Sequence, residues 1–234
     1  MIASLPKANA LYRYVRGWKW FRLAIKNGEF IPRFCDEDFS WMEEGRLRRL
    51  LLPLVCFCDI PISNSRSHRR AYGDYTIGLT KKWGTEQGLN PVLYVSKGSD
   101  LAQQLSLRFN RKIATAKIIA ADFGDFWPLL PYLKPVEGFQ KNGPHSEFKF
   151  FEQEMEWRFV PKVWESLVES RRLDNRSDEE KEAQNALVRG VRLKFNDADI
   201  EIVIVNTSGQ RNRLCRDRPS LRKRVKLWRE ISRR

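Results

Sequence analysis

Four charged residues alternate late in the chain, and they carry its strongest signal for chemistry: Glu152, Glu154, Glu156 and Arg158. The aromatic content of 151–159 favours a β-strand over a helix, and a strand sends alternate side chains to opposite faces. The charged residues would then share one face. Such a row is either a solvated surface with Arg158 as counter-ion, which is the more common arrangement, or the wall of a cleft. In a cleft, a carboxylate could hold a sugar hydroxyl and stabilise an oxocarbenium-like centre, as glycosyl transfer requires.

A second cluster, at 11–15, combines aromatic rings with a cation. Tyr12, Arg13 and Tyr14 stand there just before the first predicted helix. These side chains could supply a stacking surface and a positive charge for a nucleotide. Ordinary core packing with a surface arginine explains the same residues, and the residues alone favour that explanation.

Other catalytic arrangements are absent from the sequence. The motifs GxGxxG, GxxxxGK[ST], GxSxG and HExxH do not occur. Of the two histidines, His68 falls in a basic loop predicted over 63–70 and His145 follows a Gly-Pro pair, so both are expected in solvent. A nuclease that holds a divalent metal on the acidic row is disfavoured by Arg158 and by the lack of a supporting histidine.

The cysteines give no sign of a metal or of a disulfide framework. Their spacing is not that of structural zinc, and they are too few and too irregular for a secreted scaffold: Cys35, Cys56, Cys58 and Cys215. We therefore expect a reducing, cytoplasmic setting. The sequence contains no run of 18 or more apolar residues, so we expect no helix that spans a membrane. The first residues lack the features of a signal peptide.

Positive charge is concentrated at the end of the chain. The 234 residues carry 43 Lys and Arg against 29 Asp and Glu, and residues 211–234 hold eleven of these cations but only two acids. Such a segment could bind nucleic-acid phosphates, dock onto an acidic partner chain, or be a solvated helix face. The candidate nucleic-acid contacts are Arg211, Arg213, Arg222, Lys223, Arg224 and Lys226.

Periodicity and turn signals place these residues on elements. Helices are expected over 17–27, from Ser40 towards Leu52, and over 99–110, 111–121 and 219–231. Strands are expected over 54–60, 75–80, 91–95, 151–159, 193–195 and 200–205, with a long loop over 123–144 and a polar connector over 174–181. Because strands and helices mix without βαβ alternation, we predict an α+β domain over 1–210 with a mostly antiparallel sheet, and a basic helical segment over 211–234.

Short stretches distributed over residues 11–205 resemble one family. In order and spacing they are similar to the AbiGi-type family of bacterial abortive-infection, phage-resistance proteins: Asn27-Gly28, Ile31–Asp38, Val55–Ser63, His68, Tyr72–Lys81, Trp83-Gly84, Gly88–Val92 and Glu156–Pro161. The resemblance implies a role in phage defence or in a toxin–antitoxin pair, often as the antitoxin, with a cognate toxin or antitoxin as protein partner. It implies no chemistry by itself.

The layout is similar, more distantly, to DNA- and RNA-directed ADP-ribosyltransferases. That resemblance implies a transferase-like sheet and NAD as substrate, with Glu156 as the catalytic acid and Glu154 as the second member of a glutamate pair. Arg13 stands where a histidine is common in those enzymes. The residues implied to hold NAD are Tyr12, Arg13, Tyr14, His68 and Tyr72.

Two functions therefore compete. The preferred hypothesis is a defence effector that transfers ADP-ribose from NAD to nucleic acid, for which Glu156→Gln should abolish transfer with little loss of fold. The alternative is an antitoxin without catalytic activity, which binds a partner protein or DNA through the basic segment and loses its function on truncation after Gln210.

Overall fold

The computed structural model describes residues 8–42, 49–110, 124–142, 145–162 and 178–231 of the chain. Its centre is an eight-stranded sheet in the order β14-β13-β5-β1-β4-β11-β6, with β3 paired to β4. Only β13 and β14 run parallel among these strands, so the predicted α+β class with a mostly antiparallel sheet is confirmed. The strands are β1 Ala10–Val15, β3 Arg33–Asp38, β4 Arg49–Cys58, β5 Tyr75–Thr80, β6 Asn90–Pro91, β11 Glu156–Phe159, β13 Ile200–Val205 and β14 Val225–Leu227.

The long strand β4 connects the two halves of the sheet. Its first part pairs with β3 and its last part with β1 and β11. The helix predicted from Ser40 towards Leu52 is wrong over 49–52, because Leu50 and Leu52 are buried on the strand in a cluster with Trp41 and Phe109. Residues 43–48, which belong to the same predicted helix, lie outside the described residues.

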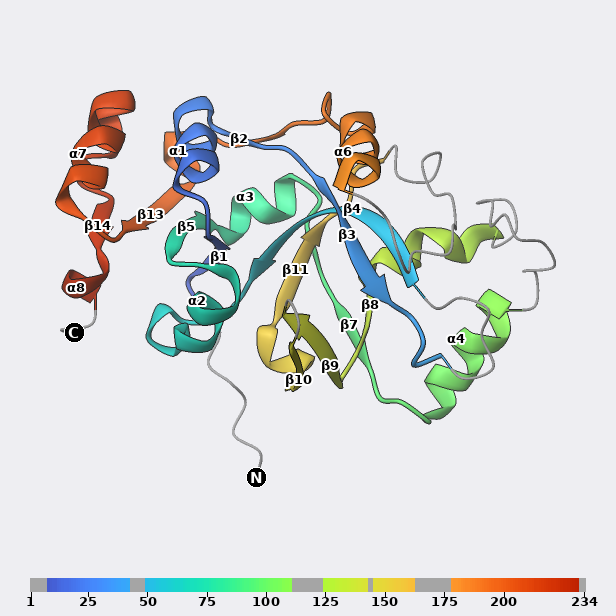
Figure 1. Cartoon of the computed structure of the whole chain (residues 1–234). Helices are drawn as coiled ribbons and strands as arrows, with labels where there is room; N and C mark the ends of the chain where they lie inside the picture. Colours follow the sequence, from blue (N-terminus) through green and yellow to red (C-terminus); the bar gives the residue numbers. More distant parts are fainter. Residues whose placement is uncertain (1–7, 43–48, 111–123, 143–144, 163–177, 232–234) are drawn as a thin grey trace.

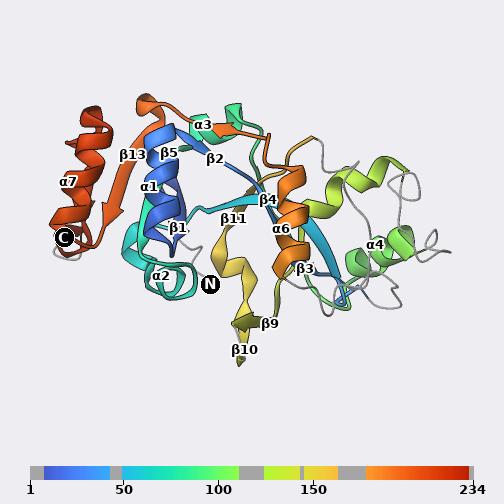
Figure 2. The same ribbon diagram turned by 45° about the horizontal axis from the view of Figure 1, so that its top comes forward.

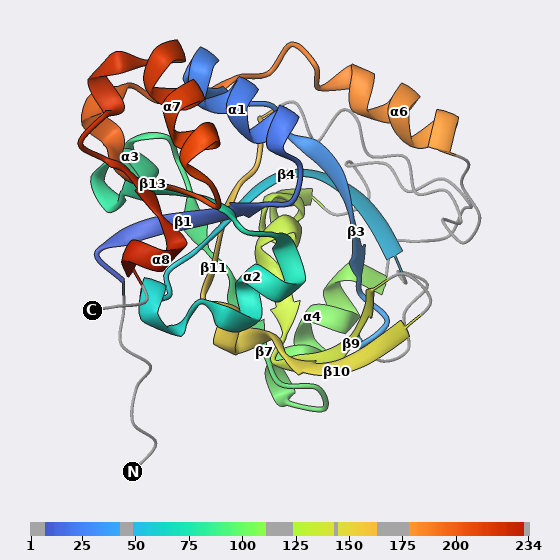
Figure 3. The same ribbon diagram turned by 60° about the vertical axis from the view of Figure 1, so that its left-hand side comes forward.

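Helices cover both faces of the sheet. They are α1 Trp18–Asn27, α2 Arg66–Tyr72, α3 Lys81–Glu86, α4 Asp100–Asn110, α6 Asp178–Leu187, α7 Ser208–Asp217 and α8 Trp228–Ile231. Figure 3 shows α1 and α7 on one side of β1 and β13, with α2 and α8 on the other. As predicted, α1 ends at Gly28, which adopts φ +68°. It buries Phe21 and Ile25, whereas Trp20 is 59% exposed.

Three small two-stranded sheets complete the fold. They pair β2 Glu29–Phe30 with β12 Leu193–Lys194, β7 Leu93–Val95 with β8 Leu133–Pro135, and β9 Glu137–Asn142 with β10 His145–Phe150. The last pair forms a hairpin that projects from the body (Figure 2). The loop expected over 123–144 is therefore wrong: its prolines 128 and 131 lie in a 3-10 segment, Gly124–Tyr132, and strands follow. The helix expected over 111–121 lies outside the described residues.

The basic end of the chain is not a helix over 219–231. A short 3-10 turn, Pro219–Leu221, leads into β14 and then α8. Burial alternates along β14, with Val225 and Leu227 inside and Lys226 outside, as strand geometry requires, and β14 pairs in parallel with β13. Residue 210 lies inside α7, whose N-terminus is capped by Thr207 and Gln210. The connector expected over 174–181 becomes α6 from Asp178 onward.

Two further 3-10 segments position the site described below: Ile62–Asn64 before α2, and Phe151–Glu154 before β11. Another 3-10 segment, Asp197–Asp199, precedes β13. The buried apolar side chains form one cluster under α1, α3 and α7, a second between β3, β4 and α4, and a third under α2 and α8. Because side chains alternate along β1, Leu11 belongs to the first cluster, and Tyr12 and Tyr14 belong to the third.

Candidate functional site

The acidic row is not one continuous strand. Phe151–Glu154 is a 3-10 turn, Met155 adopts a left-handed conformation with φ 43°, and β11 begins only at Glu156. The turn is held in place because the Asp59 N–H donates to the Met155 carbonyl at 3.0 Å. As a result Glu152 is exposed, whereas Glu154 turns into the protein. The prediction of three carboxylates on one strand face is wrong for this reason.

The charged part of the row is buried rather than solvated. Arg158 is fully buried; its Nε donates to Glu156 Oε1 at 2.9 Å and its Nη2 to Glu37 Oε2 at 2.7 Å. The remaining nitrogen, Nη1, donates to the Pro131 carbonyl at 2.6 Å. The surface arrangement expected from the sequence is therefore wrong, because β3 and the 3-10 segment before β8 cover this face.

Two lysines extend the contacts. Lys134 Nζ lies 2.7 Å from Glu154 Oε2 and 2.7 Å from Glu156 Oε2, and Lys149 Nζ lies 2.5 Å from Glu154 Oε1. The Tyr72 hydroxyl donates to Glu154 as well. The three carboxylates and three cations balance in charge, and together they form what we call the buried ion network: Glu37, Lys134, Lys149, Glu154, Glu156 and Arg158.

The ion network keeps its glutamates ionised. Burial alone would raise the pKa of Glu156, but Arg158 and Lys134 outweigh that effect and hold this pKa well below its usual range. Burial would likewise raise the pKa of Glu154, and Lys134 and Lys149 keep it low. Both oxygens of Glu156 accept hydrogen bonds: Oε1 from Arg158, and Oε2 from Lys134 and Arg158. Both oxygens of Glu156 are therefore engaged by cations in this structure.

Most of the residues implied to hold NAD lie on the same face as the ion network. Tyr12 and Glu156 both register against Cys58, from opposite sides of β4, so their side chains share a face. Tyr14 lies two residues along β1 on that face, and its ring centroid is 5.9 Å from that of His68.

His68 and Tyr72 reach this face from α2. The loop expected over 63–70 is wrong, since 66–72 is helical, and His68 is 5% exposed rather than solvated. Its ring centroid is 5.8 Å from that of Tyr72, and among the described residues neither of its ring nitrogens has a hydrogen-bond partner. Burial lowers the pKa of His68, which favours the neutral imidazole. For the second histidine, His145, no side-chain environment is described.

Arg13 lies on the opposite face of the sheet. Its guanidinium lies over the rings of Phe30 and Phe57, at 5.4 and 5.9 Å from their centroids, and donates to the Cys56 carbonyl at 2.8 Å. The structure thus brings Tyr12, Tyr14, His68 and Tyr72 to the side of Glu154 and Glu156, and it separates Arg13 from them.

The six basic residues proposed as nucleic-acid contacts do not act as one group. Three of them, Arg211, Arg222 and Lys226, line a groove of about 660 Å³ between α7 and β14. Arg213 and Lys223 are exposed outside its lining, and Arg224 turns away to donate to the Asp197 carbonyl. We call the lined hollow the α7 groove; its lining is Arg211, Asn212, Cys215, Arg216, Arg222, Val225, Lys226 and Glu230.

Sequence reasoning missed several members of both sites. Arg216 could have been found, because it is one of the eleven cations of the basic segment 211–234. Glu37, Lys134 and Lys149 carry no local signal, since they come from three separate strands that meet only in the fold. Tyr94 is a further case: its hydroxyl accepts a hydrogen bond from the Glu156 N–H at 2.9 Å.

No group of three or more His, Cys, Asp or Glu side chains in the described ranges is placed to hold a metal ion. Likewise, none of the helices that the structure describes combines the length and apolar character needed to cross a membrane.

Comparison with known proteins points to one family. A family model described as "Putative abortive phage resistance protein AbiGi, antitoxin" matches residues 28–206. The Abortive phage resistance protein AbiGi of Lactococcus lactis subsp. cremoris is 27% identical over 153 residues, which cover 56% of this chain and 61% of that protein. The match thus spans less than two thirds of that relative. No solved structure matches. The family match includes the buried ion network and leaves the α7 groove outside.

Proposed function

The chain belongs to the AbiGi family of abortive phage resistance proteins, and from that membership we propose that it is an antitoxin that restrains a toxic partner protein by binding it. The family places the chain in anti-phage defence, and the family model's description as an antitoxin supports a cognate toxin as partner. The choice of binding over catalysis rests on one observation, the engagement of both Glu156 oxygens by Arg158 and Lys134 within the buried ion network.

The cations of the ion network compete with any substrate for the Glu156 oxygens. A glutamate that stabilises a developing cation must present an oxygen to the substrate. In this protein, Arg158 occupies Oε1 of Glu156, and Lys134 and Arg158 occupy Oε2. Removing one member of such a buried pair leaves an uncompensated charge, which is strongly destabilising. The network therefore acts to hold β3, β8, β10 and β11 together.

The α7 groove supplies a surface for the partner. Four cations line it, and the single acid in the lining, Glu230, is already paired with Arg211 at 2.9 Å. The other three cations, Arg216, Arg222 and Lys226, form no ion pair with a carboxylate among the described residues. The groove therefore favours an acidic segment of the toxin.

Growth rescue tests this proposal. Each gene adjacent to that of the chain is expressed alone from an inducible promoter, and the one whose product stops growth is taken as the toxin. We expect the wild-type chain to restore growth, and R216Q/R222Q/K226Q to fail. The matched control R33Q/K82Q/R189Q, which removes three exposed cations elsewhere, should rescue like wild type. Absence of a toxic neighbour, or rescue by both triple variants, would contradict the proposal.

A second candidate function is ADP-ribosyl transfer from NAD. It is supported by the arrangement of Tyr12, Tyr14, His68 and Tyr72 on the face that carries Glu154 and Glu156. Transfer would require a Glu156 oxygen to leave Arg158 or Lys134. The test is incubation of the purified chain with labelled NAD and with RNA, single-stranded DNA, duplex DNA or the toxin. More label on an acceptor than with the heat-denatured chain would favour ADP-ribosyl transfer. If all four acceptors carry only as much label as with the heat-denatured chain, transfer to these acceptors is excluded.

A further inference from the structure

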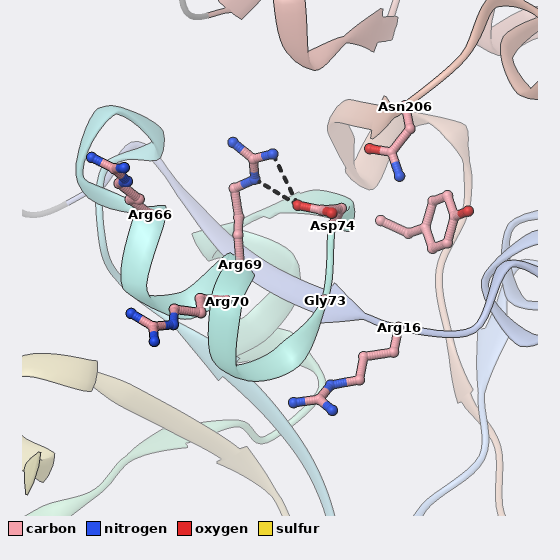
Figure 4. A pocket seen from close by; sticks show the side chains of 8 residues that line it. Arg16, Arg66, Arg69, Arg70, Gly73, Asp74 and Asn206 are labelled. Atoms are coloured by element: carbon pink, nitrogen blue, oxygen red, sulfur yellow. Dashed lines mark hydrogen bonds and ion pairs between the residues drawn. The ribbon is translucent and has the colours of Figure 1, made fainter. Parts of the chain in front are cut away.

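A second basic hollow lies beside α2, where β1 ends and β5 begins. Its volume is about 540 Å³, and Figure 4 shows four arginines around it. Arg66, Arg69 and Arg70 come from α2, and Arg16 comes from the end of β1. We call this hollow the α2 groove; the rest of its lining is Gly73, Asp74, Tyr75 and Asn206. It contains none of the residues that the sequence singled out as basic contacts.

A close backbone approach brings Arg16 to the helix. Gly73 ends α2 with φ +118°, and a Cβ there would lie 2.5 Å from the backbone of Arg16. Only glycine therefore lets the end of α2 approach the end of β1 so closely. Arg16 then donates from Nη2 to the Ala71 carbonyl, which fixes its side chain along the groove.

Arg69 is fixed in a second way. Its Nε and Nη2 both lie 2.9 Å from Asp74 Oδ1, and its guanidinium stands 3.8 Å from the centroid of the Trp228 ring. Asp74, the single acid in the lining, is thus already paired. The groove is a preformed site because two of its guanidinium groups are held by the protein itself.

Arg66 and Arg70 supply charge that the protein does not compensate. They stand four residues apart, which places them on one helical face, where like charges repel. Within the part of the chain that the structure describes, neither has a carboxylate partner, and Figure 4 shows both side chains extending from α2. Four cations against one paired acid leave an excess of three positive charges in the lining.

We propose that the α2 groove binds the phosphates of a nucleic-acid strand. Arginine presents planar, bidentate donors that match phosphate oxygens, and a strand repeats its charge at short intervals, so that one strand can meet several of these arginines at once. Asn206 at the rim adds a neutral amide of the kind that contacts phosphates. A single acidic side chain would meet only one of these arginines. The site lies apart from the α7 groove and does not rest on the antitoxin proposal.

The test measures how binding depends on salt. Fluorescent 20-nucleotide single-stranded RNA and DNA, and a 20-base-pair duplex, are titrated with the full chain at several salt concentrations. The variant R66Q/R70Q is compared with R33Q/R189Q, which removes two exposed arginines elsewhere and changes the net charge equally. We expect R66Q/R70Q to bind more weakly and to reduce the slope of log K against log salt by roughly 1.4 to 1.8 units, as two lost phosphate contacts require. The control should keep the wild-type slope.

Competitors separate the sources of negative charge. Inorganic pyrophosphate and polyglutamate are added to the wild-type chain and to R66Q/R70Q, after thermal unfolding has confirmed that both are folded. The proposal is overturned if the wild-type chain binds none of the three nucleic acids, or if the two double variants have equal slopes. It is also overturned if R66Q/R70Q loses affinity only for pyrophosphate, or only for polyglutamate, because the groove would then serve a small phosphate or an acidic protein.

Discussion

Arg158 has the most constrained environment of the residues in the candidate site. It is fully buried, it contacts Glu156 and Glu37, and it reaches a third element at Pro131. The cost of burying this charge is offset only while both carboxylates remain in place. Its side chain therefore contributes to stability through compensation of charge.

Replacement of Arg158 tests this role. We expect R158M to lower the free energy of unfolding by about 3–5 kcal/mol, because it leaves two buried carboxylates with fewer cations. Urea denaturation followed by circular dichroism measures the change. The exposed variant R189Q, whose partner Glu182 is also exposed, should stay within about 0.5 kcal/mol of wild type. Equal stability of the two variants would show that Arg158 is not structural.

Acid should weaken the protein through Glu156. Because the folded-state pKa of Glu156 lies below its ordinary value of 4.5, its contribution to stability is complete above about pH 4.5 and is lost as the pH falls towards the folded pKa. We expect E156Q to be less stable than wild type at pH 7 and to lose less stability between pH 5 and pH 3. Urea unfolding at half-unit pH intervals measures both. A wild-type pH dependence in E156Q would contradict this assignment.

The sequence indicated Glu154 and Glu156 but not their surroundings. Alternation along a strand placed Glu156 and Arg158 on one face correctly, since β11 covers both. It failed at Glu154, because Met155 interrupts the strand with a left-handed turn that no residue type predicts. The burial of the row could not be foreseen either, because Glu37 and Lys134 lie more than twenty residues away from Arg158 along the chain.

At the scale of elements, the junction of α2 and β1 depends on Gly73. Both Gly73 and Gly88 have positive φ, but a Cβ at Gly73 would lie 2.5 Å from backbone atoms, whereas Gly88 has nothing within 4 Å. We expect G73A to cost roughly 1–3 kcal/mol more than G88A, because Gly73, with φ 118° and ψ 168°, adopts a conformation essentially confined to glycine and a Cβ there would also clash with backbone atoms. Thermal or urea unfolding compares them. Equal decreases in the free energy of unfolding would mean that α2 can move away from β1 without loss of stability.

The elements that were predicted correctly carry strong local signals. The helix over 17–27 has an apolar face and a glycine at its end, and the strand over 200–205 is almost wholly apolar. The wrong predictions share a cause: 49–52 and 225–227 are strands because neighbouring strands bury them, and local propensity does not report such contacts.

At the scale of the whole molecule, the basic end of the chain is part of the core. Truncation after Gln210 would remove β14 and five buried side chains: Leu214, Leu221, Val225, Leu227 and Trp228. Burial of each contributes about 1.5–3 kcal/mol, and a typical domain is stable by only about 5–15 kcal/mol.

We therefore expect the chain truncated after Gln210 to be unfolded. Far- and near-ultraviolet circular dichroism would measure this, with R216Q/R222Q/K226Q as the folded control that removes charge alone. A folded truncated chain would show that residues 211–234 form a separate segment. The sequence showed the charge of this region but not its place in the sheet, because alternating burial over only three residues is too short a signal.

The most direct test of the account is complex formation between the purified chain and the proposed toxin partner, measured by analytical ultracentrifugation with and without NAD. We predict a complex for the wild-type chain and for R33Q/K82Q/R189Q, and none for R216Q/R222Q/K226Q. The absence of a wild-type complex, or a complex that forms only when NAD is present, would contradict an antitoxin that acts by binding through the α7 groove.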